Sequence, residues 1–218
     1  MNEQERKAPI YFLVDTSESM HGEPITRVKN GIDMCIQAVR NDQQSSKKSH
    51  VSIITFATEA KVVMKLTKVT EIASIPDFEV GGQTNYAAAI KLLNESLEND
   101  LRENTETEKG DYKAVVVLFS DGKPDIGDHT TELDKLDRRK INYFIAATTN
   151  TDEECKKALA DVVQHEENVI YLPETISGKE GYVNTKEDLI VGKPHDVSSV
   201  NIEDLPPLPS FSEDDVLI

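Results

Sequence analysis

The chain alternates between apolar runs and segments with the apolar spacing of an amphipathic helix. Four runs are rich in β-branched and aromatic residues: 10–14, 51–56, 114–119 and 141–147. Such runs are typical of strands buried on both faces of a sheet. Three segments place their apolar residues on one helical face: 25–39, 90–101 and 152–165. Strands that alternate with amphipathic helices predict an α/β fold with a mostly parallel central sheet and helices on both faces.

Weaker patterns fill the segments between these elements. Residues 60–66 are predicted to pair with 51–56 as a hairpin, which would give the sheet one antiparallel edge strand. A short helix is expected near 131–137 and a last strand at 169–172, whereas the polar run 41–49 is expected to be a loop.

The composition changes after Leu172, where glycine, proline and acidic residues replace the periodic pattern. Residues 173–218 are therefore predicted to be an appended C-terminal tail, partly extended, Pro-rich and acidic, and not a second domain. Two interpretations of this tail stay open. It could be a solvated linker, or it could pack along the domain through its spaced apolar residues and end in a docking peptide at 213–218.

Polar residues follow the predicted strands abruptly. Asp15, Ser17 and Ser19 come directly after the first apolar run, and Asp121 follows the run 114–119. Thr84 lies just after a Gly-Gly pair, in a loop where glycine permits unusual backbone angles and where a helix is expected to begin. Because open α/β sheets keep their ligand sites at the carboxyl ends of the strands, we expect these five side chains to converge on one edge.

The chemistry of this set points to a hard divalent cation. Carboxylate and hydroxyl oxygens, without histidine or cysteine, suit Mg²⁺, Mn²⁺ or Ca²⁺ and argue against zinc or copper. The charges of two aspartates balance such an ion. Mg²⁺ takes few protein ligands and retains waters, so the ion would stay open to an outside ligand, and an acidic side chain of a partner protein is the natural candidate.

Each element of the set also has an ordinary structural interpretation. Asp15-Thr16-Ser17 fits an Asx turn, Thr84 fits a helix cap and Asp121-Gly122 fits a turn. Only their conjunction favours a metal site. An enzymatic alternative is a Mg²⁺-dependent phosphohydrolase that uses Asp15 as nucleophile, although the related phosphatase motif has an aspartate where Ser17 stands. His21 and His129 are candidate general bases, but a loop histidine is more often exposed and idle.

The net charge of −16 and the pI near 4.7 argue against nucleic acid and anionic membranes as partners. The first residues are charged and lack the apolar core of a signal peptide, and no run is long enough to span a membrane, so a cytoplasmic location is expected. Cys35 and Cys155 are expected to be small buried hydrophobes without a disulfide.

These five residues, in the order Asp15-x-Ser17-x-Ser19, Thr84 and Asp121, resemble the metal-ion-dependent adhesion site (MIDAS) of von Willebrand factor type A (VWA) domains. The resemblance to these domains covers about residues 8–172. The sequence also resembles a narrower group, the bacterial TerY-type VWA proteins of tellurite-resistance systems. This resemblance rests on Pro9–Met20, Val51–Phe56 and Ser120–Pro124. The resemblance implies a Rossmann-like VWA fold, a bound Mg²⁺ or similar ion, no enzymatic activity, and assembly with protein partners, including kinase- and phosphatase-like proteins.

The sequence departs from this family at one site position. Glu18 stands where VWA domains usually have glycine, which adds a carboxylate beside the predicted metal site. The extra charge would either tighten metal binding or obstruct an acidic ligand.

Overall fold

The computed structural model describes residues 5–172, and the predicted tail at 173–218 lies outside this range. Six strands form one sheet in the order β3-β2-β1-β4-β5-β6. The strands are β1 Ala8–Asp15, β2 Ser49–Phe56, β3 Ala60–Lys68, β4 Ala114–Phe119, β5 Ile141–Thr148 and β6 Val169–Tyr171. All neighbouring strands are parallel except β2 and β3, which form the antiparallel edge pair. The predicted fold class is confirmed.

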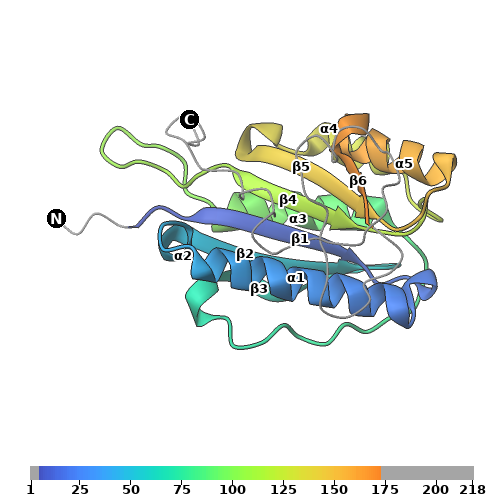
Figure 1. Cartoon of the computed structure of the whole chain (residues 1–218). Helices are drawn as coiled ribbons and strands as arrows, with labels where there is room; N and C mark the ends of the chain where they lie inside the picture. Colours follow the sequence, from blue (N-terminus) through green and yellow to red (C-terminus); the bar gives the residue numbers. More distant parts are fainter. Residues whose placement is uncertain (1–4, 173–218) are drawn as a thin grey trace.

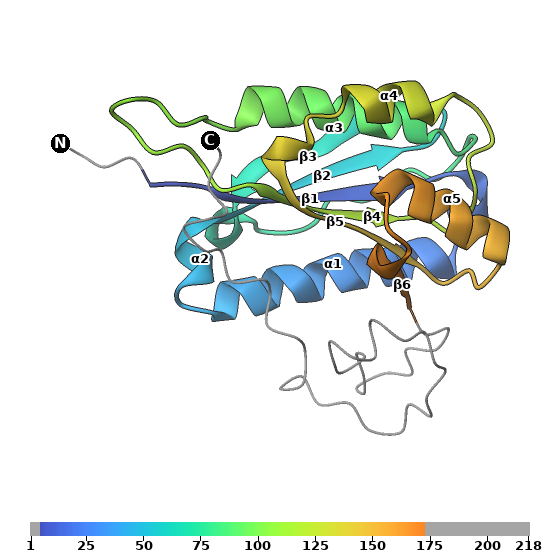
Figure 2. The same ribbon diagram turned by 90° about the horizontal axis from the view of Figure 1, so that it is seen from above.

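Helices lie on both faces of the sheet (Figures 1 and 2). The α-helices are α1 Glu23–Asn41, α2 Ser45–Lys48, α3 Tyr86–Asp100, α4 His129–Lys135 and α5 Glu153–Val163. Short 3₁₀ turns are η1 Glu18–Met20, η2 Val69–Glu71, η3 Arg138–Lys140 and η4 Glu166–Asn168. The apolar residues of α3, α4 and α5 pack on one face, whereas those of α1 pack on the other. Among the residues described, no helix combines the length and apolar character needed to cross a membrane.

The central strand β1 explains how the sheet positions a site. Its side chains alternate between the two apolar cores, with Leu13 on the α3 side and Val14 on the α1 side. The register pairs Val14 with Phe119 of β4 and Asp15 with Phe56 of β2. The carboxyl ends of these three strands therefore align at one edge, and the loops that follow them lie side by side.

Two local predictions were wrong. A short helix, α2, interrupts the predicted loop 41–49, and the Asp42 carboxylate holds its start by accepting the backbone N–H of Ser45 at 2.7 Å. Cys35 is exposed, not buried, because it lies beside the buried stripe of α1 and not on it. Cys155 is buried, as expected.

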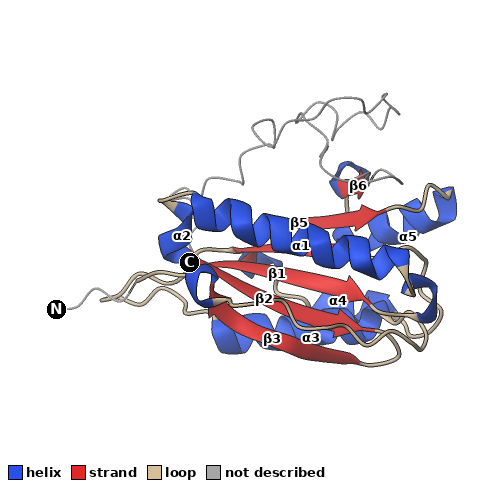
Figure 3. Cartoon of the chain, turned by 60° about the horizontal axis from the view of Figure 1, so that its bottom comes forward, coloured by secondary structure: helices blue, strands red, loops and turns tan. Residues whose placement is uncertain are grey.

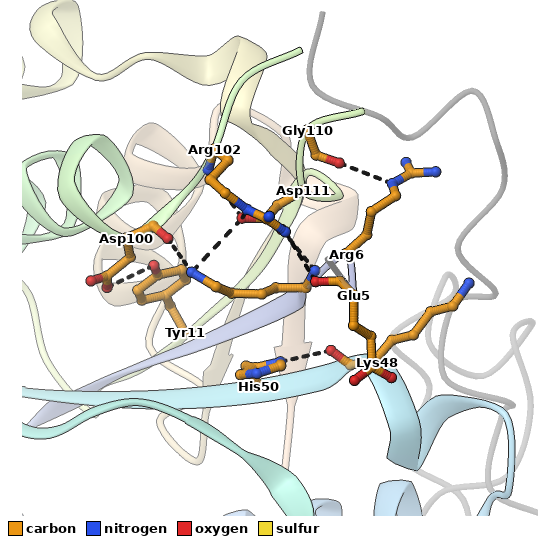
Figure 4. A network of polar contacts seen from close by, with 10 residues as sticks. Glu5, Arg6, Tyr11, Lys48, His50, Asp100, Arg102, Gly110 and Asp111 are labelled. Carbon is orange, nitrogen blue, oxygen red and sulfur yellow. Dashed lines mark hydrogen bonds and ion pairs between the residues drawn. The ribbon is translucent and has the colours of Figure 1, made fainter. Parts of the chain in front are cut away.

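The opposite end of the sheet is held by a network around Asp111 (Figure 4). The Asp111 carboxylate is fully buried and accepts the Lys7 N–H at 2.8 Å and the Arg102 N–H at 3.0 Å. The Arg102 guanidinium also donates to Asp111, at 2.7 Å. Nearby, the Tyr11 hydroxyl donates to Asp100 at 3.1 Å. These bonds join the start of β1 to the end of α3 and to the loop before β4.

Candidate metal centre

Asp15 ends β1 and lies beneath the surface at the predicted site. Its side chain is 0% exposed, and both carboxylate oxygens accept hydrogen bonds. Oδ1 accepts the backbone N–H of Ser17 at 2.8 Å, and Oδ2 accepts the hydroxyl of Ser120 at 2.6 Å. Burial raises the pKa of Asp15, and the bonds from Ser120 and Ser17 offset part of that rise. Asp15 is therefore held rigidly in one orientation.

A second layer fixes Ser120, which sequence reasoning did not identify. The Tyr86 hydroxyl donates to Ser120 Oγ at 3.0 Å and is also hydrogen-bonded to the Gly122 carbonyl. Tyr86 is the first residue of α3, and it is almost fully buried. A chain of hydrogen bonds from Tyr86 through Ser120 to Asp15, here called the relay, thus joins α3 to the end of β1 through the loop after β4.

Three oxygens above Asp15 form a short chain. Ser17 Oγ lies 3.2 Å from Ser19 Oγ, and the Ser19 hydroxyl donates to Asp121 Oδ1 at 2.8 Å. In an octahedral site with metal–oxygen distances of about 2.0–2.1 Å, adjacent ligands lie about 2.9 Å apart, whereas around Ca²⁺ they lie about 3.3–3.7 Å apart. The 2.8 Å spacing agrees with an ion the size of Mg²⁺, whereas the 3.2 Å spacing lies closer to the range around Ca²⁺.

Thr84 borders the same site from the loop before α3. Its N–H donates to Asp125 Oδ2 at 2.9 Å, and its carbonyl accepts the Asp125 N–H at 2.9 Å. The residue is 3% exposed, and its hydroxyl has no hydrogen-bond partner among residues 5–172. The helix cap is supplied by Asn85 instead, whose side chain accepts the Ala88 N–H at 3.2 Å. The Thr84 hydroxyl therefore remains available to a ligand.

The Gly-Gly loop is joined to the loop after β1 by backbone bonds. The Glu18 N–H donates to the Gly82 carbonyl at 3.1 Å, and the Gly81 N–H donates to the Thr16 carbonyl at 2.8 Å. Gly82 has φ of 90°, and a Cβ there would lie 2.7 Å from Thr58 Oγ1. Glycine is therefore required at position 82 by both its backbone angle and the space around it.

These groups line an open depression of about 530 Å³. It is bordered by Ser17, Ser19, Thr84 and Asp121, with Asp15 beneath them, so the structure brings all five predicted residues together. Further lining residues include Glu18, Lys123, Asp125, Asn150 and Asp152. Asn150 donates from Nδ2 to the Asp121 carbonyl at 2.6 Å and so braces the loop after β4.

The donor set fits a divalent cation held mainly by hydroxyls. Across the described part of the chain, no three side chains of His, Cys, Asp or Glu gather closely enough to hold an ion between them. A metal would therefore need Ser17, Ser19 and Thr84 beside Asp121. The unpartnered Thr84 hydroxyl and the close spacing of the other oxygens, 2.8–3.2 Å between neighbours, both suit this role.

Comparison with known families agrees with this geometry. Residues 10–177 match the von Willebrand factor type A domain family. The chain belongs to that family. VWA domains are typically modules of protein–protein interaction, and their MIDAS motifs bind divalent metals. The narrower resemblance to TerY-type proteins finds no support in the comparisons. No curated protein matches the chain in sequence.

Several solved structures share the fold. Proximal thread matrix protein 1 of the mussel byssus is 19% identical, with a TM-score of 0.54 over 77% of this chain and 44% of its own. The pilus adhesin SpaC of Lactobacillus rhamnosus GG is 13% identical, with a TM-score of 0.60 over 78% of this chain and 29% of its own. This VWA chain thus spans less than half of either protein. Another structure of the mussel protein, 18% identical with a TM-score of 0.51 over 76% of this chain and 41% of its own, has a zinc-occupied MIDAS motif.

Proposed function

We propose that this VWA domain is a metal-dependent protein-interaction module. One observation carries the proposal: at an open depression, Ser19 Oγ lies 3.2 Å from Ser17 Oγ and 2.8 Å from Asp121 Oδ1, beside the unpartnered hydroxyl of Thr84. Ser17, Ser19, Thr84 and Asp121 would hold the ion, and Asp15 would add its charge from below. When bound, the cation supplies a Lewis-acidic point that an acidic side chain can ligate.

The charge balance supports an acidic partner residue. Three of the four candidate ligands at the depression are neutral hydroxyls, so Asp121 is the only charged ligand among them, and the buried Asp15 adds a second negative charge from below. In the metal-free protein, an incoming carboxylate would instead meet the negative charges of Glu18, Asp121 and Asp125. Binding of an acidic ligand is therefore expected to require the metal.

The geometry gives less support to the phosphohydrolase alternative. A nucleophilic carboxylate must reach the phosphorus atom, but Asp15 is fully buried and both its oxygens accept hydrogen bonds. Neither His21 nor His129 lines the depression. The His129 ring instead contacts the ring of Tyr86 edge-on, with the two ring centroids 6.0 Å apart. We propose that the chain has no hydrolytic activity, and no turnover of a generic phosphate ester with Mg²⁺ is the expected result.

A narrower proposal concerns the cellular setting. The sequence resemblance at Pro9–Met20 and Ser120–Pro124 supports a TerY-like role in a cytoplasmic tellurite-resistance or stress-response system with kinase- and phosphatase-like partners. A pull-down from native lysate, with and without chelator, tests this role. Chelator-sensitive capture of a kinase- or phosphatase-like protein would support it, and loss of that capture in a Ser17→Ala/Ser19→Ala variant would link it to the site.

Calorimetry with Mg²⁺, Mn²⁺, Ca²⁺ and Zn²⁺ tests the metal site itself. Wild type is expected to bind Mg²⁺ or Mn²⁺ at one site, and Ser17→Ala/Ser19→Ala is expected to abolish the binding. Ser74→Ala is a matched control, because Ser74 is exposed and lies away from the depression. Equal affinity in wild type and the double variant would refute the assignment, and preference for Zn²⁺ would refute the predicted choice of ion.

A further inference from the structure

The sheet face that carries α1 is covered unevenly by the described elements. Helix α1 packs its buried stripe against β1 and β2, and the segment around Ile72 and Ile75 packs into the same core. The helices α3, α4 and α5 all pack on the opposite face. Figures 2 and 3 show α1 as the long helix on its side of the sheet, with β5 and β6 beyond its flank.

The part of the sheet beyond α1 presents apolar side chains. The register pairs Val115 with Tyr143 and Val117 with Ile145, and Val115 and Val117 point to the α1 side. Tyr143 is 45% exposed, and Val117 and Ile145 are only partly buried. We call Val117, Tyr143, Ile145 and the partly buried Ile170 of β6 the open half-face.

An apolar cavity adjoins the open half-face. It has a volume of about 70 Å³ and lies between α1 and strands β1, β2 and β4. Val117 belongs to both the cavity lining and the open half-face, and Cys35 of α1 also lines the cavity. The apolar surface that residues 5–172 leave open therefore continues from β6 across β5 and β4 to the flank of α1.

The course of the chain indicates what covers this surface. After β6, the Leu172 N–H donates to the Thr148 carbonyl at 2.7 Å, and the partly buried Leu172 side chain packs against the α1-side core. The described chain thus ends on the face that its own helices cover only in part. Neighbouring strands lie about 4.8 Å apart, so the distance from β6 to β4 is about 10 Å, which a few extended residues can cross.

The sequence after Leu172 contains two apolar groups that lie within twenty residues of it along the chain. Tyr182-Val183 and Leu189-Ile190-Val191 come after the stretch that matches the VWA family, which ends at residue 177. A segment tethered this closely has a high effective concentration at the surface, which favours it over a separate molecule. We propose that residues 182–191 of the same chain cover the open half-face beside α1.

A photocrosslinker attached to Cys35 in the full-length protein tests this proposal. Cys35 is exposed and lines the adjoining cavity, whereas Cys155 is buried, so a thiol reagent is directed to Cys35. Mass spectrometry is expected to find crosslinks from Cys35 to residues 182–191. A control carries Cys35→Ser and Lys91→Cys, which moves the probe to an exposed position of α3 on the opposite face. This control is expected to give no such crosslinks.

Two further arms decide between occupants. Leu189→Asp/Ile190→Asp is expected to reduce the crosslink yield by about tenfold or more, because it puts charge on an apolar contact, whereas Val216→Asp/Leu217→Asp should leave the yield unchanged. In a mixture of ¹⁵N-labelled and unlabelled chains, the crosslinks should join peptides of one isotope only. Mixed-isotope crosslinks would show that a second copy occupies the surface, and an absence of crosslinks to 182–191 would equally overturn the proposal.

Discussion

Ser120→Ala tests whether the relay behind Asp15 supports the metal site. The change removes the hydroxyl that donates to Asp15 Oδ2 at 2.6 Å and leaves the Ser17 N–H bond to Oδ1 in place. Tyr86 keeps its hydrogen bond to the Gly122 carbonyl, so the lost interaction is mainly that of Asp15. The variant therefore isolates one hydrogen bond to a fully buried carboxylate.

The expected magnitude follows from the burial of Asp15. A hydrogen bond to a charged group contributes about 1.5–3 kcal/mol, and the free energy of unfolding of the metal-free protein should fall by about that amount. Loss of a group that orients a metal-site carboxylate typically lowers metal affinity by about 10–100-fold, and we expect the affinity for Mg²⁺ to fall within that range. Ser120→Thr keeps a hydroxyl and should recover most of both losses.

Calorimetry with Mg²⁺ and urea unfolding in chelator are the two assays. Tyr86→Phe provides an internal comparison, because it removes the bond to Ser120 while Ser120 can still donate to Asp15. Its effect on metal affinity should be smaller than that of Ser120→Ala. If Ser120→Ala binds Mg²⁺ as tightly as wild type, or if Tyr86→Phe has the larger effect, the relay does not position Asp15.

Three further predictions concern other parts of the molecule. Burial alone would raise the pKa of Asp111, but hydrogen bonds from Arg102 and Lys7 outweigh this effect and lower it. The ionised Asp111 should therefore stabilise the fold at neutral pH, and this stabilisation should be lost as pH falls below about 4. Asp111→Asn should lower the free energy of unfolding by about 2–3 kcal/mol at pH 7, with a smaller difference from wild type in acid, as urea titrations at several pH values would show. Removal of the metal by a chelator should lower the melting temperature only by the amount that loss of a bound ligand causes. A calorimetric scan in which the chelator alone unfolds the whole domain would contradict this. Glu18→Gly should weaken metal binding without weakening partner binding, and unchanged affinity in calorimetry would mean that Glu18 does not act on the ion.

The fold could be predicted because its strands and helices carry strong local patterns. The run 114–119 has no polar residue and matches β4 throughout, and the antiparallel partner of β2 was evident from its hairpin spacing. Boundaries set by single side chains were harder to predict. Asp128 starts α4 two residues earlier than the apolar pattern suggests, because its carboxylate accepts the Thr130 N–H at 3.0 Å.

The candidate ligands of the site were predictable, but the residues that support them were not. Asp15, Ser17 and Asp121 were evident because an abrupt polar residue after a buried strand marks a strand end. Ser120 stands beside Asp121 in the same loop, but its partnership with Asp15 depends on the pairing of Val14 with Phe119, which no local pattern encodes. The role of Tyr86 likewise depends on how α3 packs over the end of β4.

The two polar networks of this domain lie at opposite ends of β1, and this separation makes the predictions independent. Asp111 ties the amino end of β1 to the loop before β4, where no metal-site residue lies. Asp15 and Ser120 join the carboxyl ends of the same two strands. The effects of substitutions that share no partner are expected to add. A variant that carries both Asp111→Asn and Ser120→Ala should therefore show the sum of the two losses in stability, but only the loss in metal affinity caused by Ser120→Ala. If Asp111→Asn alone weakened Mg²⁺ binding, the two ends of the sheet would be coupled, and the stability of the domain could not be separated from its site.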